Sequence, residues 1–524
     1  MDQHDDTFHV YDTTLRDGSQ REGLSLSVED KLAVATHLDD LGVGFIEGGW
    51  PGANPKDEAF FRRAAAGDLT LRNAQLAAFG ATRKAGSVAA DDPQVRALVA
   101  ASTPVVTLVA KSHVGHVERA LRTTREENLA MVRDTVEFLC REGRRVFLDA
   151  EHFFDGYHLD RDYALSVVRT AYDAGADVVA LCDTNGGMLP GRIAEIVHEL
   201  AGEGLRVGIH AHNDTSCAVA NSLAAIDAGA SHVQGTANGY GERAGNADLF
   251  AVVAALELKK GRQVLPQGTL ADLVRVSHAI AELANIAPDP HQPWVGASAF
   301  AHKAGLHASA LKVDPDLYQH TDPALVGNDM RVLVSELAGR ASVELKARSL
   351  DIEVDRETVG RVIERVKAME AAGYSFEAAE ASFELLLREE VDGARPSFFD
   401  LESYRVISES RPNGEHVSEA TVKLHAKGGE RFVATGEGNG PVNALDRALR
   451  QALERVHPQL ASFELVDYKV RILEGAHGTG AVTRVLVRTS DGEREWDTVG
   501  VDENVIAASW EALEDAYTYG LMRG

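Results

Sequence analysis

Eight short β-prone segments recur along the first part of the chain, and this rhythm is the feature that most constrains its fold. Each segment ends in polar or glycine-rich residues and leads into an amphipathic helical pattern. The segments are FHVYDTT (8–14), GFIEGG (44–49), LAAFGAT (76–82), VVTLVAKS (105–112), RVFLDAEH (145–152), DVVALCDTN (177–185), RVGIHAHND (206–214) and HVQGTANGYG (232–241). Eight such strand–helix units predict a (β/α)8 TIM barrel over residues 1–286. A dinucleotide-binding doubly wound sheet fits less well, since no GxGxxG follows the first strand.

Two breaks divide the rest of the chain. The proline-rich APDPHQPWVG (287–296) opens a mostly helical linker region, expected over residues 287–390 and expected to complete the active site. VDGARPSFFD (391–400) opens a C-terminal α+β domain over residues 391–524. Its two similar halves each run through three strands into a helix rich in Ala and Leu, which predicts an internal βββα repeat. Such a module binds a small effector, pairs chains or serves a structural role.

Composition narrows the class of protein. The formal net charge of −27 argues against nucleic acid and anionic membrane as partners. We find no apolar run long enough to span a membrane and no charged-then-apolar leader. The three cysteines, Cys140, Cys182 and Cys217, form no ligand-like or disulfide-like pattern, which fits a reducing cytosol. We therefore expect a cytoplasmic, enzyme-like protein.

Two histidines stand one residue apart at the end of the seventh predicted strand. Side chains at positions i and i+2 of a strand point the same way, so His210 and His212 are aimed at one point in space. They are either hydrogen-bonded core histidines or two ligands of one metal ion. Barrel closure brings the eighth and first strands beside them, so Asp17 and the loop NGYGERAGN (238–246) flank the pair. This mixed nitrogen and oxygen set suits Mn, Mg, Zn or Co with open positions for a chelating substrate.

A barrel further predicts that functional side chains gather at the carboxyl ends of its strands. Chemistry-bearing residues do follow the predicted strands, namely Arg16, Asp17, Glu47, Glu151, Thr184, His210, His212 and the loop ending at Asn246. We expect these residues to share one barrel mouth. Glu47 is expected to orient Arg16, to bond a water near the metal, or to be a carboxylate of the mouth without a specific role.

Long motifs in the chain resemble a known family. YDTTLRDGSQREG (11–23) resembles the signature of the DRE-TIM metallolyases, and residues 210–249 resemble the second signature of their synthase branch. That branch includes 2-isopropylmalate, homocitrate and citramalate synthases. The resemblance covers the whole chain, and the tail is similar to the allosteric domain of 2-isopropylmalate synthase. IEGGWPGANPKDEAFF (46–61) is most similar to the longer bacterial members that use pyruvate.

The resemblance implies a role for each matching residue. Asp17, His210, His212 and Asn246 match the metal ligands. Arg16 matches the arginine facing the keto oxygen, and Thr184 matches the threonine that holds the substrate carboxylate. Glu151 matches an acidic residue near the reacting methyl group. His307, in AHKAGLHASALK, matches a histidine that reaches the mouth from the segment after the barrel, usually that of the partner subunit.

The implied reaction condenses acetyl-CoA with a 2-keto acid and water. Its carbon nucleophile needs a base with a near-neutral pKa, for which His307 is suited and which Glu151 could assist; a capping or core role is the alternative for His307. Pyruvate is the favoured keto acid, which would give (R)-citramalate on the route to isoleucine. The alternatives are 2-ketoisovalerate, as in 2-isopropylmalate synthases, and 2-ketoglutarate, as in homocitrate synthases. We expect a homodimer with an amino-acid feedback inhibitor at the C-terminal domain.

Other functions fit the residues of this chain less well. The related lyases carry a cysteine in the glycine-rich loop, where this chain has Arg243 and Ala244, which favours condensation over cleavage. Biotin-dependent carboxyltransferases use a barrel lysine beside the metal, and none of the strand-end residues named above is a lysine. If the chain were a non-catalytic effector-binding protein, the complete set of metal and substrate residues would be present by coincidence. Some 2-isopropylmalate synthases carry a tyrosine near LVGNDMRVLVSELAGRAS (325–342), and this stretch contains none.

Overall fold

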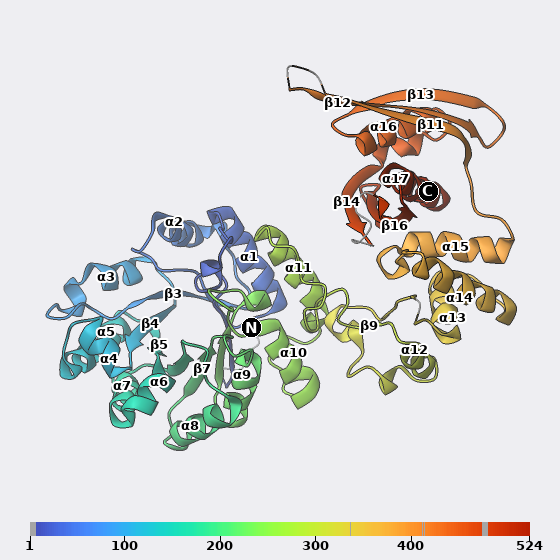
Figure 1. Ribbon diagram of the computed structural model, residues 1–524. Helices are drawn as coiled ribbons and strands as arrows, with labels where there is room; N and C mark the ends of the chain where they lie inside the picture. The colour runs from blue at the N-terminus through green and yellow to red at the C-terminus, as the bar shows by residue number, and fades with distance from the viewer. Residues whose placement is uncertain (1–6, 336, 411, 413, 474–479) are drawn as a thin grey trace. The chain divides into compact units, whose positions relative to one another are not determined.

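A closed parallel barrel forms the first part of the computed structural model, which describes residues 7–335, 337–410, 412, 414–473 and 480–524 (Figure 1). Its strands follow one another in sequence order, and β1 closes the barrel by pairing in parallel with β8. The strands are β1 His9–Asp12, β2 Phe45–Glu47, β3 Gln75–Ala81, β4 Val105–Lys111, β5 Arg145–Glu151, β6 Val178–Asp183, β7 Val207–Ala211 and β8 His232–Gly235. The predicted TIM barrel is therefore confirmed.

Helices surround the barrel, and Figure 1 shows them around the ring of strands. Their apolar faces and the outward faces of the strands form one buried core, which includes Val34, Leu38, Val136 and Val168. The helices are α1 Val28–Leu41, α2 Pro55–Arg63, α3 Pro93–Ala100, α4 Val114–Arg119, α5 Arg125–Arg141, α6 Phe153–Leu159, α7 Arg161–Asp173, α8 Pro190–Gly202, α9 Ala218–Asp227, α10 Leu249–Lys260 and α11 Leu273–Leu283. A Ser27 capping box starts α1, and left-handed Gly42 ends it just before β2.

The chain divides into two compact units. The first comprises residues 1–300 and 321–329, and the second comprises residues 301–320 and 330–524. The linker region belongs mainly to the second unit, where its helices enclose a small core around Val343, Val362 and Phe383. Its elements are β9 Ala301–His302, α12 Gly305–Leu311, β10 Arg331–Val332, α13 Arg340–Ser349, α14 Arg356–Ala371 and α15 Glu380–Asp392.

Two βββα halves make up the C-terminal domain, as the internal repeat predicts. Each half is a three-stranded antiparallel sheet covered by one helix: α16 packs on β12 and β13, and α17 packs on β15 and β16. The first half contains β11 Phe399–Ser410, β12 His416–Ala426, β13 Arg431–Gly438 and α16 Pro441–Leu453. The second contains β14 Glu464–Ile472, β15 Thr483–Ser490, β16 Glu495–Asp502 and α17 Val505–Arg523. Leu449, Val485 and Leu513 lie in one core shared by both halves.

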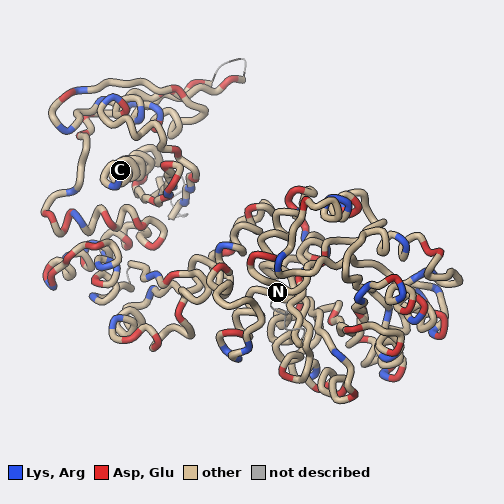
Figure 2. The backbone as a smooth tube through the Cα atoms, turned by 180° about the vertical axis from the view of Figure 1, so that it is seen from behind, with Lys and Arg blue, Asp and Glu red and all other residues tan. Residues whose placement is uncertain are grey.

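Acidic residues occur throughout both units, with basic residues interspersed among them (Figure 2). Within the part of the chain that the structure describes, no helix has the length and apolar character needed to cross a membrane.

Candidate active site

The carboxyl ends of the barrel strands open into one cavity of about 690 Å³. The predicted residues at the ends of β1, β5, β6 and β7 all line it: Arg16, Asp17, Glu151, Thr184, His210 and His212. Asp149 and Cys182, one layer deeper on β5 and β6, line it as well. The structure thus brings together side chains that are up to about two hundred residues apart in the sequence, as parallel barrel strands require.

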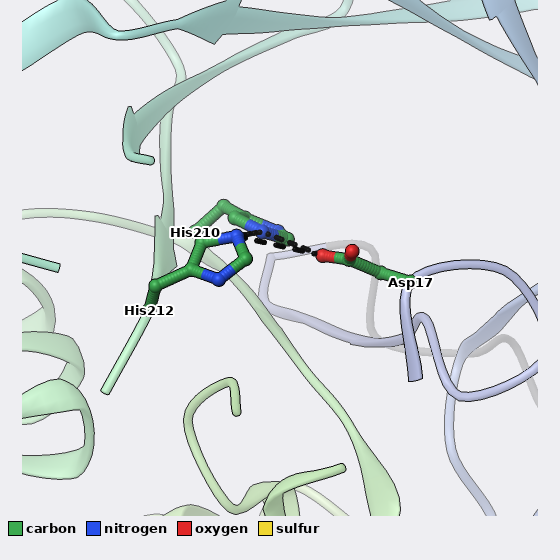
Figure 3. A group of neighbouring side chains, drawn as sticks. All are labelled: Asp17, His210 and His212. Carbon is green, nitrogen blue, oxygen red and sulfur yellow. Dashed lines mark hydrogen bonds and ion pairs between the residues drawn. The ribbon is translucent and has the colours of Figure 1, made fainter. Parts of the chain in front are cut away.

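Asp17, His210 and His212 converge inside this mouth, as Figure 3 shows. The Oδ2 atom of Asp17 lies 3.1 Å from Nε2 of His210 and 3.7 Å from Nε2 of His212, and the two Nε2 atoms are 3.3 Å apart. All three side chains are buried. Within the described ranges, these three residues are the one group of His, Cys, Asp and Glu side chains close enough to share a metal ion.

Backbone geometry explains this convergence. The two histidines follow the two-residue alternation of β7, while a tight turn after β1 presents Asp17. In that turn the backbone N–H groups of Arg16, Asp17 and Gly18 all donate to the carbonyl of Thr13, at 2.9 to 3.2 Å.

Asn246 lies beside His212, on the loop after β8, and lines a neighbouring cavity instead of the 690 Å³ one. Its backbone forms an antiparallel bridge with His212, and its side-chain Nδ2 donates to the carbonyl of Tyr240 at 3.1 Å. Its Oδ1 is buried and has no hydrogen-bond partner among the described residues. A buried amide oxygen left without a partner is costly, and a bound cation is one partner that would satisfy it.

Two glycines permit this approach. A Cβ atom at Gly241 would stand 2.3 Å from Nδ2 of Asn246, and one at Gly245 would stand 2.1 Å from the carbonyl oxygen of Gly239. Both glycines also have positive φ angles, of 150° and 90°, which favour glycine.

The donor set fits a divalent cation. One carboxylate and two imidazoles converge, an unpaired amide oxygen lies on the loop next to His212, and the converging group contains no cysteine that would point to a closed structural zinc site. Burial by itself raises the pKa of Asp17, but Arg16 and His210 lower it far below the ordinary value, so its carboxylate is charged. Burial lowers the pKa of His212 to about 4, which keeps that imidazole neutral and able to bind a metal.

Arg16 lies beside the triad and is held by Glu47. The Nε of Arg16 donates to Oε1 of Glu47 at 2.5 Å, and its guanidinium group stacks over Phe79, with Cζ 3.9 Å from the ring centroid. Glu47 is fully buried, and Tyr11 donates to its other oxygen at 2.7 Å. Burial alone would lower the pKa of Arg16, but Glu47 and Asp17 raise it above its ordinary value, so the cation is permanent. Of the three alternatives for Glu47, this geometry supports the orientation of Arg16.

Thr184 and Glu151 lie at the ends of β6 and β5, across the closed barrel from β1 and β2. The Oγ1 of Thr184 accepts the backbone N–H of His152 at 2.8 Å, which leaves its own hydroxyl hydrogen available to a substrate. Glu151 forms an ion pair with Lys111, which also lines the cavity. His152 leaves the strand in a left-handed conformation with φ of 56° and stacks on His116, in line with a structural role.

His307 lies in the second compact unit, on α12, and is half-buried. Its ring stacks on Tyr318, with centroids 4.1 Å apart and planes inclined by 29°. Sequence reasoning missed this tyrosine because it precedes the tyrosine-free stretch 325–342. No periodic pattern in the sequence indicates that this ring stacks on His307.

Sequence reasoning also missed a clamp between the loops at the mouth. Arg243 binds both oxygens of Asp214, at 2.9 and 3.0 Å, and donates to the carbonyl of Thr184 at 2.7 Å. These contacts tie together the loops after β6, β7 and β8, which carry Thr184, Asp214 and Asn246.

Three family models match successive parts of the chain. The HMGL-like family model matches residues 7–280, so the barrel is that of an HMGL-like enzyme. The homocitrate synthase post-HMGL domain-like model matches residues 294–373, and the LeuA allosteric (dimerisation) domain model matches residues 377–521.

Relatives of similar length refine this assignment. The chain is 68% identical to an (R)-citramalate synthase of Streptomyces coelicolor, over 99% of this chain and 97% of that protein. It is 50% identical to the (R)-citramalate synthase of Aquifex aeolicus, over 98% of each chain. A 2-isopropylmalate synthase of Methanocaldococcus jannaschii is 31% identical over 97% of this chain and 94% of that one. The chain belongs to the family of the (R)-citramalate synthases.

Proposed function

We propose that this chain condenses acetyl-CoA with pyruvate and water to give (R)-citramalate and CoA. The observation that carries the proposal is the buried group of Asp17, His210 and His212 beside the fixed guanidinium of Arg16, in the mouth of a family-typical barrel. Full-length identity of 42% to 68% with (R)-citramalate synthases supports the choice of substrates.

Asp17, His210, His212 and Asn246 would hold the divalent cation. When bound there, the cation supplies Lewis acidity toward the keto carbonyl of the substrate. Arg16 donates hydrogen bonds to the keto oxygen and stabilises the negative charge that develops on it, because a guanidinium keeps its proton at all working pH values. The Thr184 hydroxyl donates to the substrate carboxylate, which orients the ketone in the mouth.

A base must remove a proton from the methyl group of acetyl-CoA. We assign this role to His307 and an assisting role to Glu151, whose carboxylate is held at the cavity wall by Lys111. The resulting carbon nucleophile attacks the keto carbon, and the alkoxide takes up a proton. Water then hydrolyses the thioester, which releases CoA and makes the overall reaction irreversible.

The surroundings of His307 support a role at a mouth rather than in a core. Large apolar side chains on and beside α12 are exposed, among them Leu306 at 73%, Val313 at 81% and Leu317 at 58%. Apolar side chains exposed together mark a surface that docks on another one. We infer that this region covers a barrel mouth in the working enzyme, and in a homodimer that mouth belongs to the partner subunit.

An assay of free CoA release tests the proposed reaction. Acetyl-CoA is offered with pyruvate, 2-ketoisovalerate or 2-ketoglutarate in turn, with Mn²⁺, Mg²⁺, Zn²⁺ or Co²⁺ and with excess chelator. We expect turnover with pyruvate that the chelator abolishes and that one of these ions restores. Faster turnover with 2-ketoisovalerate would instead favour a 2-isopropylmalate synthase, the alternative that the 31% identical relative represents.

A second cavity supports feedback regulation. It has a volume of about 430 Å³ and lies where the amino ends of α16 and α17 meet β14. Val442, Leu465 and Ile506 give it an apolar wall, and no side chain caps the first N–H groups of α16. An amino-acid carboxylate fits such a helix end, and a branched aliphatic side chain fits the apolar wall. We infer that isoleucine binds here, as the end product of a pathway that begins with citramalate.

Substitution in this second cavity tests the feedback site. Val442→Arg fills a cavity that is lined only by residues of the C-terminal domain, so we expect unchanged basal turnover and loss of inhibition by isoleucine. The exposed Val456→Arg serves as the matched control and is expected to retain inhibition. Inhibition by leucine rather than isoleucine would point to the leucine pathway.

Edge strands of the same domain support a homodimer. Apolar side chains on β14 are exposed, including Val466 at 49%, Val470 at 47% and Ile472 at 58%. Such strand edges are templates for pairing with a second chain. Light scattering coupled to size-exclusion chromatography should give twice the mass of one chain, and Val470→Asp should shift the measured mass toward that of the monomer.

Three free cysteines support a cytoplasmic location for the enzyme.

A further inference from the structure

Two buried polar side chains inside the barrel have no part in the chemistry assigned above. Gln234 on β8 is fully buried and is the register partner of His210 on β7. Asp149 on β5 is only 3% exposed and lines the floor of the 690 Å³ cavity. A buried amide and a buried carboxyl are costly unless they are hydrogen-bonded, so their partners show what they stabilise.

The hydrogen bonds between these residues run in one direction. Nε2 of Gln234 donates to Oδ1 of Asp149 at 2.7 Å, because a carboxylate oxygen accepts and the amide nitrogen must therefore face it. The other end of the same amide, Oε1, lies 2.8 Å from Nδ1 of His210. That oxygen has no hydrogen to give, so Nδ1 of His210 carries the hydrogen and donates it.

The hydrogen on Nδ1 of His210 leaves the other ring nitrogen, Nε2, without a hydrogen when the ring is neutral. Nε2 of His210 is the atom that faces Asp17, at 3.1 Å, and so is the one available to a cation. A neutral imidazole binds a metal through the nitrogen without hydrogen, and the hydrogen bond of the opposite nitrogen decides which one that is. The chain Asp149–Gln234–His210 therefore selects the ring form that metal binding requires.

We propose that Asp149 is a positioning residue that fixes the tautomer and orientation of His210 through Gln234. The inference rests on the proposed function, in which His210 is a metal ligand. Without the carboxylate, the Gln234 amide group can turn over and present its nitrogen to Nδ1. That arrangement places the ring hydrogen on Nε2, toward the cation, and opposes binding.

The test exchanges the two groups at nearly constant volume. Asp149→Asn replaces a carboxylate that can only accept from Gln234 with an amide that can also donate to it, so the direction of Gln234 is no longer fixed. The affinity for Mn²⁺ should then fall by about 10- to 100-fold. Combining Asp149→Asn with Gln234→Glu places the carboxylate at position 234 and the amide at position 149. The new carboxylate accepts from Nδ1 of His210 and from the new amide, so Nδ1 again carries the ring hydrogen. The double variant should recover Mn²⁺ affinity to within about threefold of wild type.

Binding is measured without substrates, by titrating full-length protein with Mn²⁺ and following free ion by electron paramagnetic resonance. Asp12→Asn is the matched control, since Asp12 is a fully buried barrel carboxyl that accepts from Thr14 and not from Gln234. Its Mn²⁺ affinity should match that of wild type. Thermal unfolding of each variant shows whether it is folded.

The outcomes separate this inference from the proposed function. Wild-type protein that binds no divalent ion would defeat the metal site itself. Wild type that binds Mn²⁺ while folded Asp149→Asn binds equally well would overturn the inference. So would a double variant that fails to fold or to regain affinity, because a purely packing role for Asp149 predicts no rescue by the exchanged pair.

Discussion

Nε of Arg16 and Oε1 of Glu47 lie 2.5 Å apart, and the carboxylate of this pair is completely enclosed by the barrel. A charged hydrogen bond in such a place fixes the direction of the guanidinium group. Arg16 also lines the cavity, and its Nη1 is 3.6 Å from Oδ1 of Asp17. The arginine is thus held in place before any substrate arrives.

Glu47→Gln should lower kcat by about 100-fold, because the neutral amide no longer holds Arg16 where charge develops on the keto oxygen. The KM for acetyl-CoA should stay within about twofold of wild type. Steady-state kinetics checks both values. Tyr11→Phe removes one hydrogen bond to Glu47 but keeps the charge, so its loss should be under about 10-fold. Equal losses in the two variants would contradict the orienting role of the charge.

Metal binding should release a proton. Burial alone would lower the pKa of His210, but the hydrogen bond and charge of Asp17 raise it, so the metal-free ring keeps a second proton to a higher pH than an ordinary histidine does. Below this raised pKa a cation must displace that proton, and its apparent association constant should fall about tenfold for each unit decrease in pH. Calorimetry with Mn²⁺ in buffers of different ionisation enthalpy measures the proton count. An affinity that does not change between about pH 6 and pH 8 would rule this coupling out.

Arg243→Ala should loosen the loops that carry Thr184 and Asn246, raising the KM for the keto acid by about tenfold with a smaller effect on kcat. Stability should change by less than about 1 kcal/mol, since the ion pair with Asp214 is partly exposed. Arg275→Ala removes a comparable ion pair, with Asp272, away from the mouth and should leave both constants unchanged. An unchanged KM in Arg243→Ala would show that the clamp is dispensable.

His307→Ala should lower kcat by about 100- to 10,000-fold while leaving Mn²⁺ affinity unchanged, because the base lies outside the metal-ligand set. Tyr318→Ala removes the ring on which the imidazole stacks and should cost less, about tenfold. Turnover and Mn²⁺ titration are measured on the same samples. Near-full turnover of His307→Ala with intact metal binding would remove His307 from this role.

Barrel periodicity made much of the site predictable. Because strand ends of a TIM barrel share one mouth, positions such as Asp17, Thr184 and His212 could be placed together from the strand pattern alone. The His-x-His spacing gave the common direction of the two imidazoles, and Figure 3 shows them meeting Asp17 as expected. The βββα repeat was also predictable, because the alternation of side chains along a strand and the glycines of turns are local signals.

Contacts across the barrel interior were not predictable in this way. Gln234 and Asp149 sit on strands three positions apart in the closed barrel, and nothing local in the sequence indicates that one carboxyl orients one amide. The clamp from Arg243 depends on loop conformation, including a left-handed φ of 54° at that residue. Tyr318 was missed because stacking on His307 depends on how a short turn folds back, which no periodic pattern encodes.

His307 and the group of Asp17, His210 and His212 belong to different compact units of the chain, the second and the first. Under the proposed function, the base and the ligands of the cation can therefore be altered independently of each other. A variant of one unit could then stop carbanion formation while the other unit still binds its ion.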